Sequence, residues 1–293
     1  MHGMYIIPGL IDPHIHIESS MLTVGEFARA MAISCVACVV ADPHEIANVM
    51  GVDGVVSMIR EAENLPVEIY FTAPSCVPAS EFETSGAVLD HSAVEDILRL
   101  DRVMGLAEVM NYPGVISGQE DIIKKIDIAK RLGKKVDGHC PGLKGDDLDI
   151  YISRGIESDH ECSSGEEALE KLRKGMHIMI RRGSAADNLD VLGYLMEQNI
   201  PLNRCMFCSD DLEADDILVS RRGILSSIRE SIEIGLDPVD AIRMATLNPA
   251  MYFNINGFGS LTPGKIASFF VTDDLKNMKP VRIFMKGRDI EHL

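Results

Sequence analysis

Apolar and polar positions along the chain follow a repeating pattern, in which a short β-forming run ends in a polar residue and an amphipathic segment follows. Eight such runs occur: "YIIPGLIDPHIH", "CVACVVADPHE", "VEIYFTAPSC", "VMGLAEVM", "KKVDGH", "ESDHE", "HIMIRRGS" and "RCMFCSDD". Strands that alternate with helices predict a parallel α/β fold, and eight parallel strands are the number that closes a barrel.

The segments between the runs have helical periodicity. "EEALEKLRKG" (166–175) places Ala168, Leu169 and Leu172 on one helical face and ends at a glycine. The same behaviour predicts helices in "GEFARAMA" (25–32), "GVVSMIREAE" (54–63), "EDIIKKIDIAKRLG" (120–133), "NLDVLGYLMEQN" (188–199) and "RGILSSIRESIEIG" (222–235).

The pattern changes after about residue 255, where glycine and proline turns surround two β-rich runs. This segment is too short for a substantial core of its own. The sequence therefore predicts a TIM-like (β/α)8 barrel over residues 1–255, with a small C-terminal β appendage over residues 256–293 that is the remnant of a small β domain.

Composition narrows the cellular setting of this 293-residue chain. No apolar run reaches the ~20 residues that cross a bilayer, and the N-terminus "MHGMYIIPGL" lacks the features of a signal peptide. The net charge of −17 opposes binding to nucleic acids. We therefore expect a cytoplasmic protein with neither a membrane nor a nucleic-acid partner.

The seven cysteines are an odd number, and several lie in apolar runs. Free, buried thiols in a reducing compartment fit this usage best. Cys35/Cys38 and Cys205/Cys208 have the C-x-x-C spacing of zinc sites, but residues three apart on a strand point to opposite faces. We interpret these thiols as structural.

Candidate chemistry lies where the β-runs end, because the carboxyl ends of barrel strands converge on one mouth. His14 and His16 are two residues apart on a predicted strand and so share one face. Histidine is the commonest metal ligand, so the pattern predicts a metal site. The polar residues at the run ends are His14, His16, Asp42, His44, Ser75, Glu108, His139, His160, Arg181, Asp210 and Asp211.

Several stretches together resemble the adenine deaminases of the amidohydrolase superfamily, from about Ile6 to near the C-terminus. They are "PGLIDPHIHIESSML", "ADPHEIANVMG", Ser75 to Ala87, "GLAEVMNYPGVISG", "DGHCPGL", "SDHEC", "IRRGSAADNL" and "CSDD". The combination is much more specific than any one of these stretches.

The resemblance implies a centre of two divalent ions. His14, His16 and Asp210 would bind the first ion, His139 and His160 the second, and Glu108 would bridge them. An anionic bridge relieves the repulsion between two close cations. Nitrogen and oxygen ligands without thiolate suit Mn²⁺ or Fe²⁺ best, with Zn²⁺ possible.

The same resemblance implies that a hydroxide bridging the two ions attacks C6 of adenine, giving hypoxanthine and ammonia. Asp210 would accept the proton of the nucleophile, and Glu108 or another acid would protonate the ring. His44 and Asp42 are expected to assist proton movement or orient the ring. Substrate contacts are expected from Ser75, Arg181 and Ser184. The acids flanking the ligands, Glu45, Asp159 and Glu161, are expected to orient imidazoles.

The chain departs from this family pattern at several positions. Arg182 stands where an acid is usual, Gly223 where a histidine is usual, and Ser268 where an acid is usual. The strands that commonly precede "PGLID" and a further C-terminal domain are missing, as in a compact variant, a fragment or a paralogue. The run "IASFFVTDD" would then leave its apolar edge exposed or covered by another subunit, so we expect a homo-oligomer.

Three alternatives stay open. Another hydrolase of the same superfamily would share every ligand and act on a different purine, a pterin or a cyclic amide. A cytidine-deaminase type of zinc site is superficially matched by His16-Ile17-Glu18 and Cys205-x-x-Cys208, but no proline precedes either C-x-x-C pair. A non-catalytic metal-binding scaffold would keep the barrel without the activity.

Overall fold

The computed structural model describes residues 3–80, 82–220 and 222–290, and its centre is a set of parallel strands. The eight strands expected from the sequence are β2 (Leu10–His16), β3 (Val36–Ala41), β4 (Glu68–Ala73), β5 (Val103–Val109), β6 (Lys135–Gly138), β7 (Ser158–Asp159), β8 (His177–Arg181) and β9 (Cys205–Cys208). Their order in space follows their order in the chain, and each pairs in parallel with its neighbour within two sheets.

Two connections join these sheets into a ring. The N–H of Glu157 donates to the carbonyl of Val136 (2.9 Å) and links the start of β7 to β6. Directly after β9, the short strand β10 (Asp210–Asp211) pairs in parallel with β2, with Asp210 opposite Ile15. The prediction of a TIM-like barrel is thereby confirmed.

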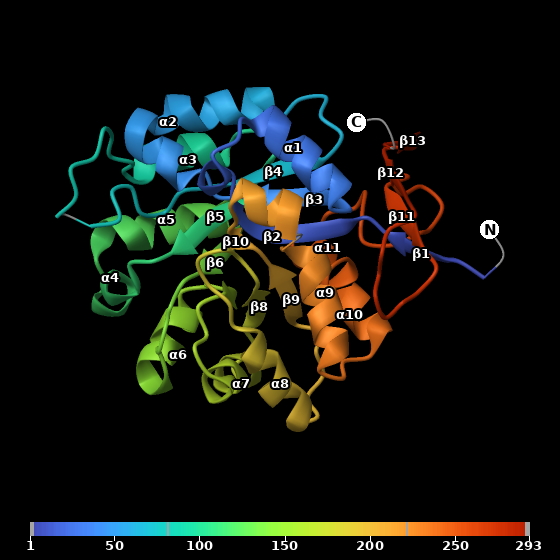
Figure 1. Cartoon of the computed structure of the whole chain (residues 1–293). Helices are drawn as coiled ribbons and strands as arrows, with labels where there is room; N and C mark the ends of the chain where they lie inside the picture. Colours follow the sequence, from blue (N-terminus) through green and yellow to red (C-terminus); the bar gives the residue numbers. More distant parts are fainter. Residues whose placement is uncertain (1–2, 81, 221, 291–293) are drawn as a thin grey trace.

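Helices surround the strands (Figure 1). They are α1 (Val24–Ile33), α2 (His44–Glu61), α3 (His91–Leu98), α4 (Tyr112–Ser117), α5 (Glu120–Arg131), α6 (Gly145–Ser153), α7 (Gly165–Arg173), α8 (Leu189–Glu197), α9 (Ile224–Glu233), α10 (Pro238–Met244) and α11 (Leu247–Tyr252), with a 3₁₀ turn at Glu18–Ser20 and a π-helical turn at Asp216–Ser220. Each predicted helix is present. In α5, for example, Ile122, Ile126 and Ala129 are buried, as their spacing requires.

A second, antiparallel sheet lies beside the barrel and holds both ends of the described chain (Figure 1). Its strands are β1 (Tyr5–Pro8), β11 (Phe269–Thr272), β12 (Arg282–Met285) and β13 (Arg288–Asp289), in that order. The expectation of an exposed or subunit-covered edge at "IASFFVTDD" is wrong, because β11 pairs with β1 on one side and with β12 on the other.

The first predicted β-run is also corrected, because it forms two strands that belong to different sheets. Gly9 separates β1 from β2, and its N–H donates to the carbonyl of Ser268 (2.9 Å). A Cβ at position 9 would lie 2.4 Å from the Cβ of Ala37 and 3.1 Å from the Ser268 oxygen. Only glycine lets the chain pass between the barrel and the small sheet at this distance.

Changing Gly9 to alanine is therefore expected to lower the free energy of unfolding by ~1–3 kcal/mol, because the added methyl group forces backbone or Ala37 to move. Urea denaturation measures the change. Gly25→Ala in α1 is the matched control, since nothing lies within 4 Å of its added Cβ, and its stability should be unchanged or raised by up to about 1 kcal/mol. Equal stability of the two variants would contradict the close-packing role of Gly9.

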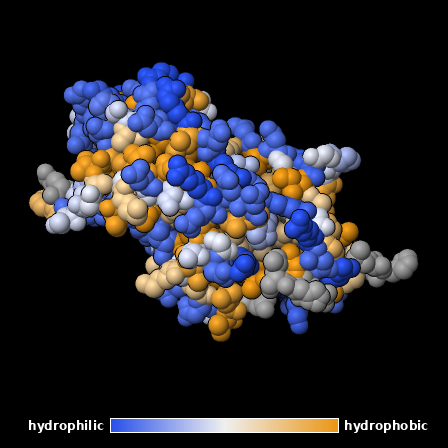
Figure 2. All heavy atoms as spheres, turned by 90° about the horizontal axis from the view of Figure 1, so that it is seen from above, coloured by the Kyte–Doolittle hydropathy of each residue, from blue (hydrophilic) through white to orange (hydrophobic). Residues whose placement is uncertain are grey.

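The surface mixes hydrophilic and apolar side chains, as Figure 2 shows for the face seen from above. Val49 and Met50 of α2 are among the exposed apolar residues. All seven cysteines are buried and none forms a disulfide, in agreement with the structural interpretation of the thiols. Within the described ranges, none of the helices combines the length and the apolar character needed to span a bilayer.

Candidate metal centre

The polar residues predicted to converge do meet at the carboxyl ends of the barrel strands. His14 and His16 lie in β2, Glu108 in β5 and Asp210 in β10, whereas His139 and His160 directly follow β6 and β7. All except His139 are buried. These six side chains come from five strands or strand ends, since His14 and His16 share β2, and they form one cluster.

Asp210 lies against the two histidines of β2. Its Oδ1 atom is 3.3 Å from His14 Nε2 and 3.1 Å from His16 Nε2. The other ring nitrogen of His16, Nδ1, is 3.0 Å from the carbonyl oxygen of Asp42. Because a carbonyl only accepts, this contact places a proton on Nδ1, so that Nε2, which faces Asp210, is the nitrogen that would bind a metal ion.

Glu108 lies between this group and the remaining histidines, and its two oxygens face different sides. Oε1 is 3.5 Å from His16 Nε2. Oε2 is 2.5 Å from His139 Nδ1 and 3.2 Å from His160 Nε2. One carboxylate therefore contacts both sets of imidazoles, which is the arrangement expected of a bridging ligand.

Charge and burial act together on these groups. Burial opposes ionisation of Glu108, but hydrogen bonds from His139 and His160 more than offset it and hold the Glu108 pKa well below its usual value. Burial also raises the pKa of Asp210, but the imidazoles of His14 and His16 outweigh burial and lower that pKa below its usual value. Both carboxylates are therefore anionic at neutral pH, as metal ligands must be.

The donor set fits divalent metal ions. The Nε2 atom of His14 is buried, and its 3.3 Å contact with Asp210 Oδ1 lacks hydrogen-bond geometry, so a further partner such as a metal ion would satisfy it. Among the described residues, the sets of possible ligand atoms that lie within 4.8 Å of one another include His14–His160–Asp210, Glu108–His139–His160, His16–Asp210–Asp211 and His16–Asp42–His44–Glu108. Imidazole nitrogens and carboxylate oxygens without thiolate suit Mn²⁺, Fe²⁺ or Zn²⁺.

His44 and Asp42, which follow β3, have side-chain atoms within 4.8 Å of the ligand atoms of His16 and Glu108. His44 begins α2, and its Nδ1 atom is 3.1 Å from Asp42 Oδ2 and 3.6 Å from Glu108 Oε1. Burial lowers the pKa of His44, but the Asp42 carboxylate outweighs this effect and raises that pKa to about 9. The imidazole is partly exposed, so a protonated His44 is accessible from the barrel mouth.

The three residues expected to contact substrate already have protein partners. The Ser75 hydroxyl donates to the carbonyl of Glu108 (2.5 Å), and the Ser184 hydroxyl donates to Asp216 Oδ2 (2.6 Å). Arg181 donates to Asp210 Oδ2 (2.8 Å) and forms a two-pronged contact with Glu161. Their substrate contacts stay predictions, whereas the structure gives each a role in supporting neighbouring groups.

The flanking acids contact the cluster's surroundings in different ways. Glu161 Oε1 lies 3.8 Å from His139 Nδ1 and 3.6 Å from His160 Nε2. Asp159 accepts the backbone N–H of Cys140 (2.8 Å). Glu45 accepts from Ser19 (3.2 Å), which also donates to Asp211 (2.6 Å).

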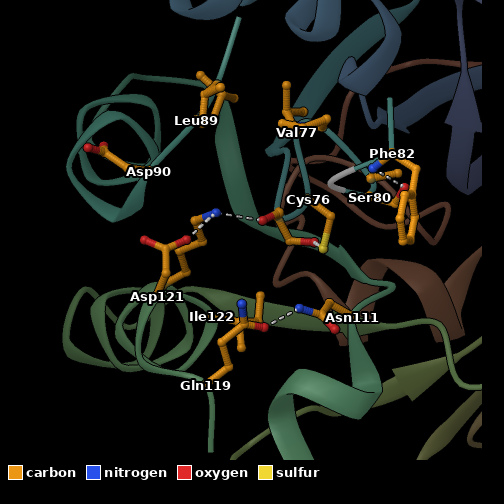
Figure 3. Close-up of a pocket in the computed structure, with 15 residues that line it drawn as sticks. Cys76, Val77, Ser80, Phe82, Leu89, Asp90, Asn111, Gln119, Asp121 and Ile122 are labelled. Carbon is orange, nitrogen blue, oxygen red and sulfur yellow. Dashed lines mark hydrogen bonds and ion pairs between the residues drawn. The ribbon is translucent and has the colours of Figure 1, made fainter. Parts of the chain in front are cut away.

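A cavity of about 560 Å³ adjoins the cluster on the side of β4. Figure 3 shows that it lies between the segment that contains Cys76, Val77 and Leu89 and the segment from Asn111 to Ile122. Ser75 links it to the cluster, since this residue lines the cavity and binds the Glu108 backbone. The sequence had no signal for this cavity, because loops distant in the chain form it.

The departures from the family pattern have local structural explanations. Arg182 is bound by Asp187 and by Glu230 (Nη2 to Oε2, 2.5 Å), so its positive charge is compensated. Gly223 precedes α9 with a φ of 100°, a conformation that side chains rarely adopt. Ser268 belongs to the joint with the small sheet, where its hydroxyl accepts the N–H of Lys286 (2.9 Å).

Comparison with known proteins places these observations in context. A model described as the amidohydrolase family matches residues 5–290. Curated adenine deaminases match almost the whole chain: that of Desulfatibacillum aliphaticivorans is 48% identical over 98% of this chain and 50% of its own length, and that of Clostridium acetobutylicum is 44% identical over 100% and 52%. The chain spans about half the length of the curated relatives it matches.

Solved structures share the fold at low sequence identity. A β-aspartyl dipeptidase from Fervidobacterium islandicum has a TM-score of 0.70 at 20% identity, covering 98% of this chain and 83% of that one. The crystal structure of an adenine deaminase has a TM-score of 0.66 at 16% identity, covering 98% and 87%. A dihydroorotase has a TM-score of 0.64 at 15% identity, covering 97% and 85%.

Proposed function

The chain belongs to the amidohydrolase family, and from this premise we propose that its barrel site deaminates adenine hydrolytically to hypoxanthine and ammonia. The observation that carries the proposal is the position of Glu108, whose two carboxylate oxygens face separate groups of histidines. The identity of 44–48% to curated adenine deaminases supports adenine as the substrate.

Divalent ions are the cofactors that the family implies, and we assign two of them to this site. His14, His16 and Asp210 would hold one ion, His139 and His160 the other, and Glu108 both. Mn²⁺ or Fe²⁺ would suit this donor set best, with Zn²⁺ an alternative. When bound, such ions supply Lewis-acid activation of water.

The side chains would handle the protons of the reaction. Asp210, anionic and held by Arg181 through Oδ2, presents Oδ1 as the base that takes a proton from the attacking water. Attack at C6 removes the aromaticity of the ring, so a ring nitrogen must gain a proton. The protonated His44, whose Nδ1 atom lies 3.6 Å from Glu108 Oε1, would deliver it, whereas the anionic Glu108 has no proton to give.

A direct assay tests this function. Protein purified with Mn²⁺ or Fe²⁺ is expected to release ammonia from adenine, and to do so far better than from guanine, cytosine or dihydroorotate. Treatment with a chelator should remove the activity, and added metal should restore it, because no ligand in the set supplies the Lewis acid.

The substrate comparison also separates the rival assignments. Turnover of another purine, a pterin or a cyclic amide without turnover of adenine would favour a different hydrolase of the same family. Fewer than two bound ions together with no turnover of any substrate would favour a metal-binding scaffold. The homo-oligomeric state and the cytoplasmic location expected from the sequence remain to be measured by light scattering and by fractionation.

A further inference from the structure

A fully buried lysine lies behind the second half of the histidine cluster. Lys171 of α7 has no exposed side-chain surface, and its ammonium group has three acceptors. They are the carbonyl of Cys140 (2.8 Å), Asp159 Oδ2 (2.9 Å) and Glu167 Oε1 (2.6 Å). Each of the three N–H bonds of the ammonium therefore has a partner.

The two carboxylates of this network reach the backbone on either side of the ligands. Asp159 Oδ1 accepts the N–H of Cys140 (2.8 Å), and its Oδ2 accepts the N–H of Glu161 (3.3 Å). Glu167 accepts the N–H of Gly142 (2.8 Å) through Oε1 and the N–H of Ser163 (3.1 Å) through Oε2. The network thus binds the two loops that follow β6 and β7.

These loops carry His139 and His160. Cys140, which follows His139, has both its N–H and its carbonyl in the network. His160 lies between Asp159 and Glu161, which are joined by the Asp159 side chain. The network therefore holds the backbone next to both imidazoles.

Burial of this triad is not explained by stability alone. Two carboxylates and one ammonium leave a net negative charge, and taking such charges out of water costs about as much as their attraction returns. Charged groups that form hydrogen bonds around metal ligands commonly orient those ligands.

We propose that Lys171 is a positioning residue for the second metal ion, acting through Asp159 and Cys140 to hold His139 and His160 in reach of the same Glu108 oxygen. This role rests on the proposed two-ion site. It predicts a selective loss, in which the second ion is bound more weakly while the ion held by His14, His16 and Asp210 is not affected.

The test titrates metal-free protein with Mn²⁺, with the free ion followed by electron paramagnetic resonance and the bound ion by elemental analysis. Wild-type protein should bind two ions. Lys171→Met, which keeps the length of the side chain, should keep the first affinity and weaken the second by roughly 10–100-fold. Lys125→Met is the matched control, because Lys125 is also buried and binds a carbonyl and a carboxylate, those of Ser75 and Asp121.

Lys171→Met leaves the Asp159 carboxylate buried without its cation and can therefore impair folding. A second variant keeps the test decisive in that case. Asp159→Asn/Lys171→Met removes both charges and keeps an oxygen for the Cys140 N–H, and it should show the same selective loss. Unchanged affinity for both ions in either variant, or equal weakening of both ions, overturns the positioning role. Wild-type protein that binds fewer than two ions overturns the two-ion site as well, whereas two ions without adenine turnover overturn only the proposed reaction.

Discussion

Glu108→Gln is expected to lower the proposed adenine turnover by more than ~100-fold, because changes at residues that merely support metal ligands already cost about 10–100-fold. The amide keeps the shape of the side chain but not its charge. In glutamine an NH₂ group replaces one of the two oxygens, and this group cannot accept a hydrogen bond. The contact with His16 is lost if Oε1 is replaced, and the contacts with His139 and His160 are lost if Oε2 is replaced. Metal content should fall together with activity.

The control for this substitution is Asp137→Asn. Asp137 is as buried as Glu108, at 3% exposure, and its Oδ1 accepts from Tyr252 (2.6 Å) and Ser158 (2.8 Å) rather than from a histidine of the cluster. This variant measures how much activity and metal content are lost when any buried carboxylate of the barrel is changed to an amide. Steady-state assays with metal analysis decide the matter, and near-normal turnover by Glu108→Gln would refute its role.

Asp210→Asn is expected to reduce kcat by a similar ~10²–10⁴-fold, because the amide cannot take a proton from water. The backbone should be little affected, since Asp210 has a φ of 61° and asparagine tolerates this left-handed region as well as aspartate does. The amide oxygen can still face His14 and His16, so metal binding should suffer less than in Glu108→Gln.

Asp211→Asn provides the comparison for Asp210. Asp211 is the next residue of β10, and its Oδ1 accepts from Ser19 (2.6 Å) rather than facing the histidines of β2. Turnover by Asp211→Asn should stay within several-fold of wild type. If both asparagine variants lost the same activity, loss of local negative charge rather than loss of a base would explain the effect.

The barrel could be predicted from sequence because its signals are local. A polar residue lies at or near the end of each predicted β-run. Because the carboxyl ends of the strands converge in a parallel barrel, this pattern predicts that His14, Glu108 and Asp210 meet. The 54–63 helix is one element whose extent was missed. It is the second half of α2, and the first half escaped notice because Gly51 interrupts the helix with a φ of 62°.

The rest depended on packing between distant segments. The division of the first β-run at Gly9 follows from its closeness to Ala37 and Ser268, which no periodicity records. Lys171 lies on an amphipathic helix, and a lysine on such a helix is expected on the solvent-exposed face. In the structure its side chain is instead fully buried. Arg181, which the sequence predicts to contact substrate, donates to Asp210 and Glu161. These partners lie far from it in the sequence, so no local pattern predicts them.

The pairing of β1 with β11 also constrains how the protein is made. Tyr5 lies opposite Thr272, so a ribosome must reach Thr272 before the first described strand can find its neighbour. Contacts of such long sequence separation form late, after the entropy of a large loop has been lost. The strand that carries His14 and His16 follows this joint directly, so the start of that strand is held by the small sheet only after Thr272 has been added.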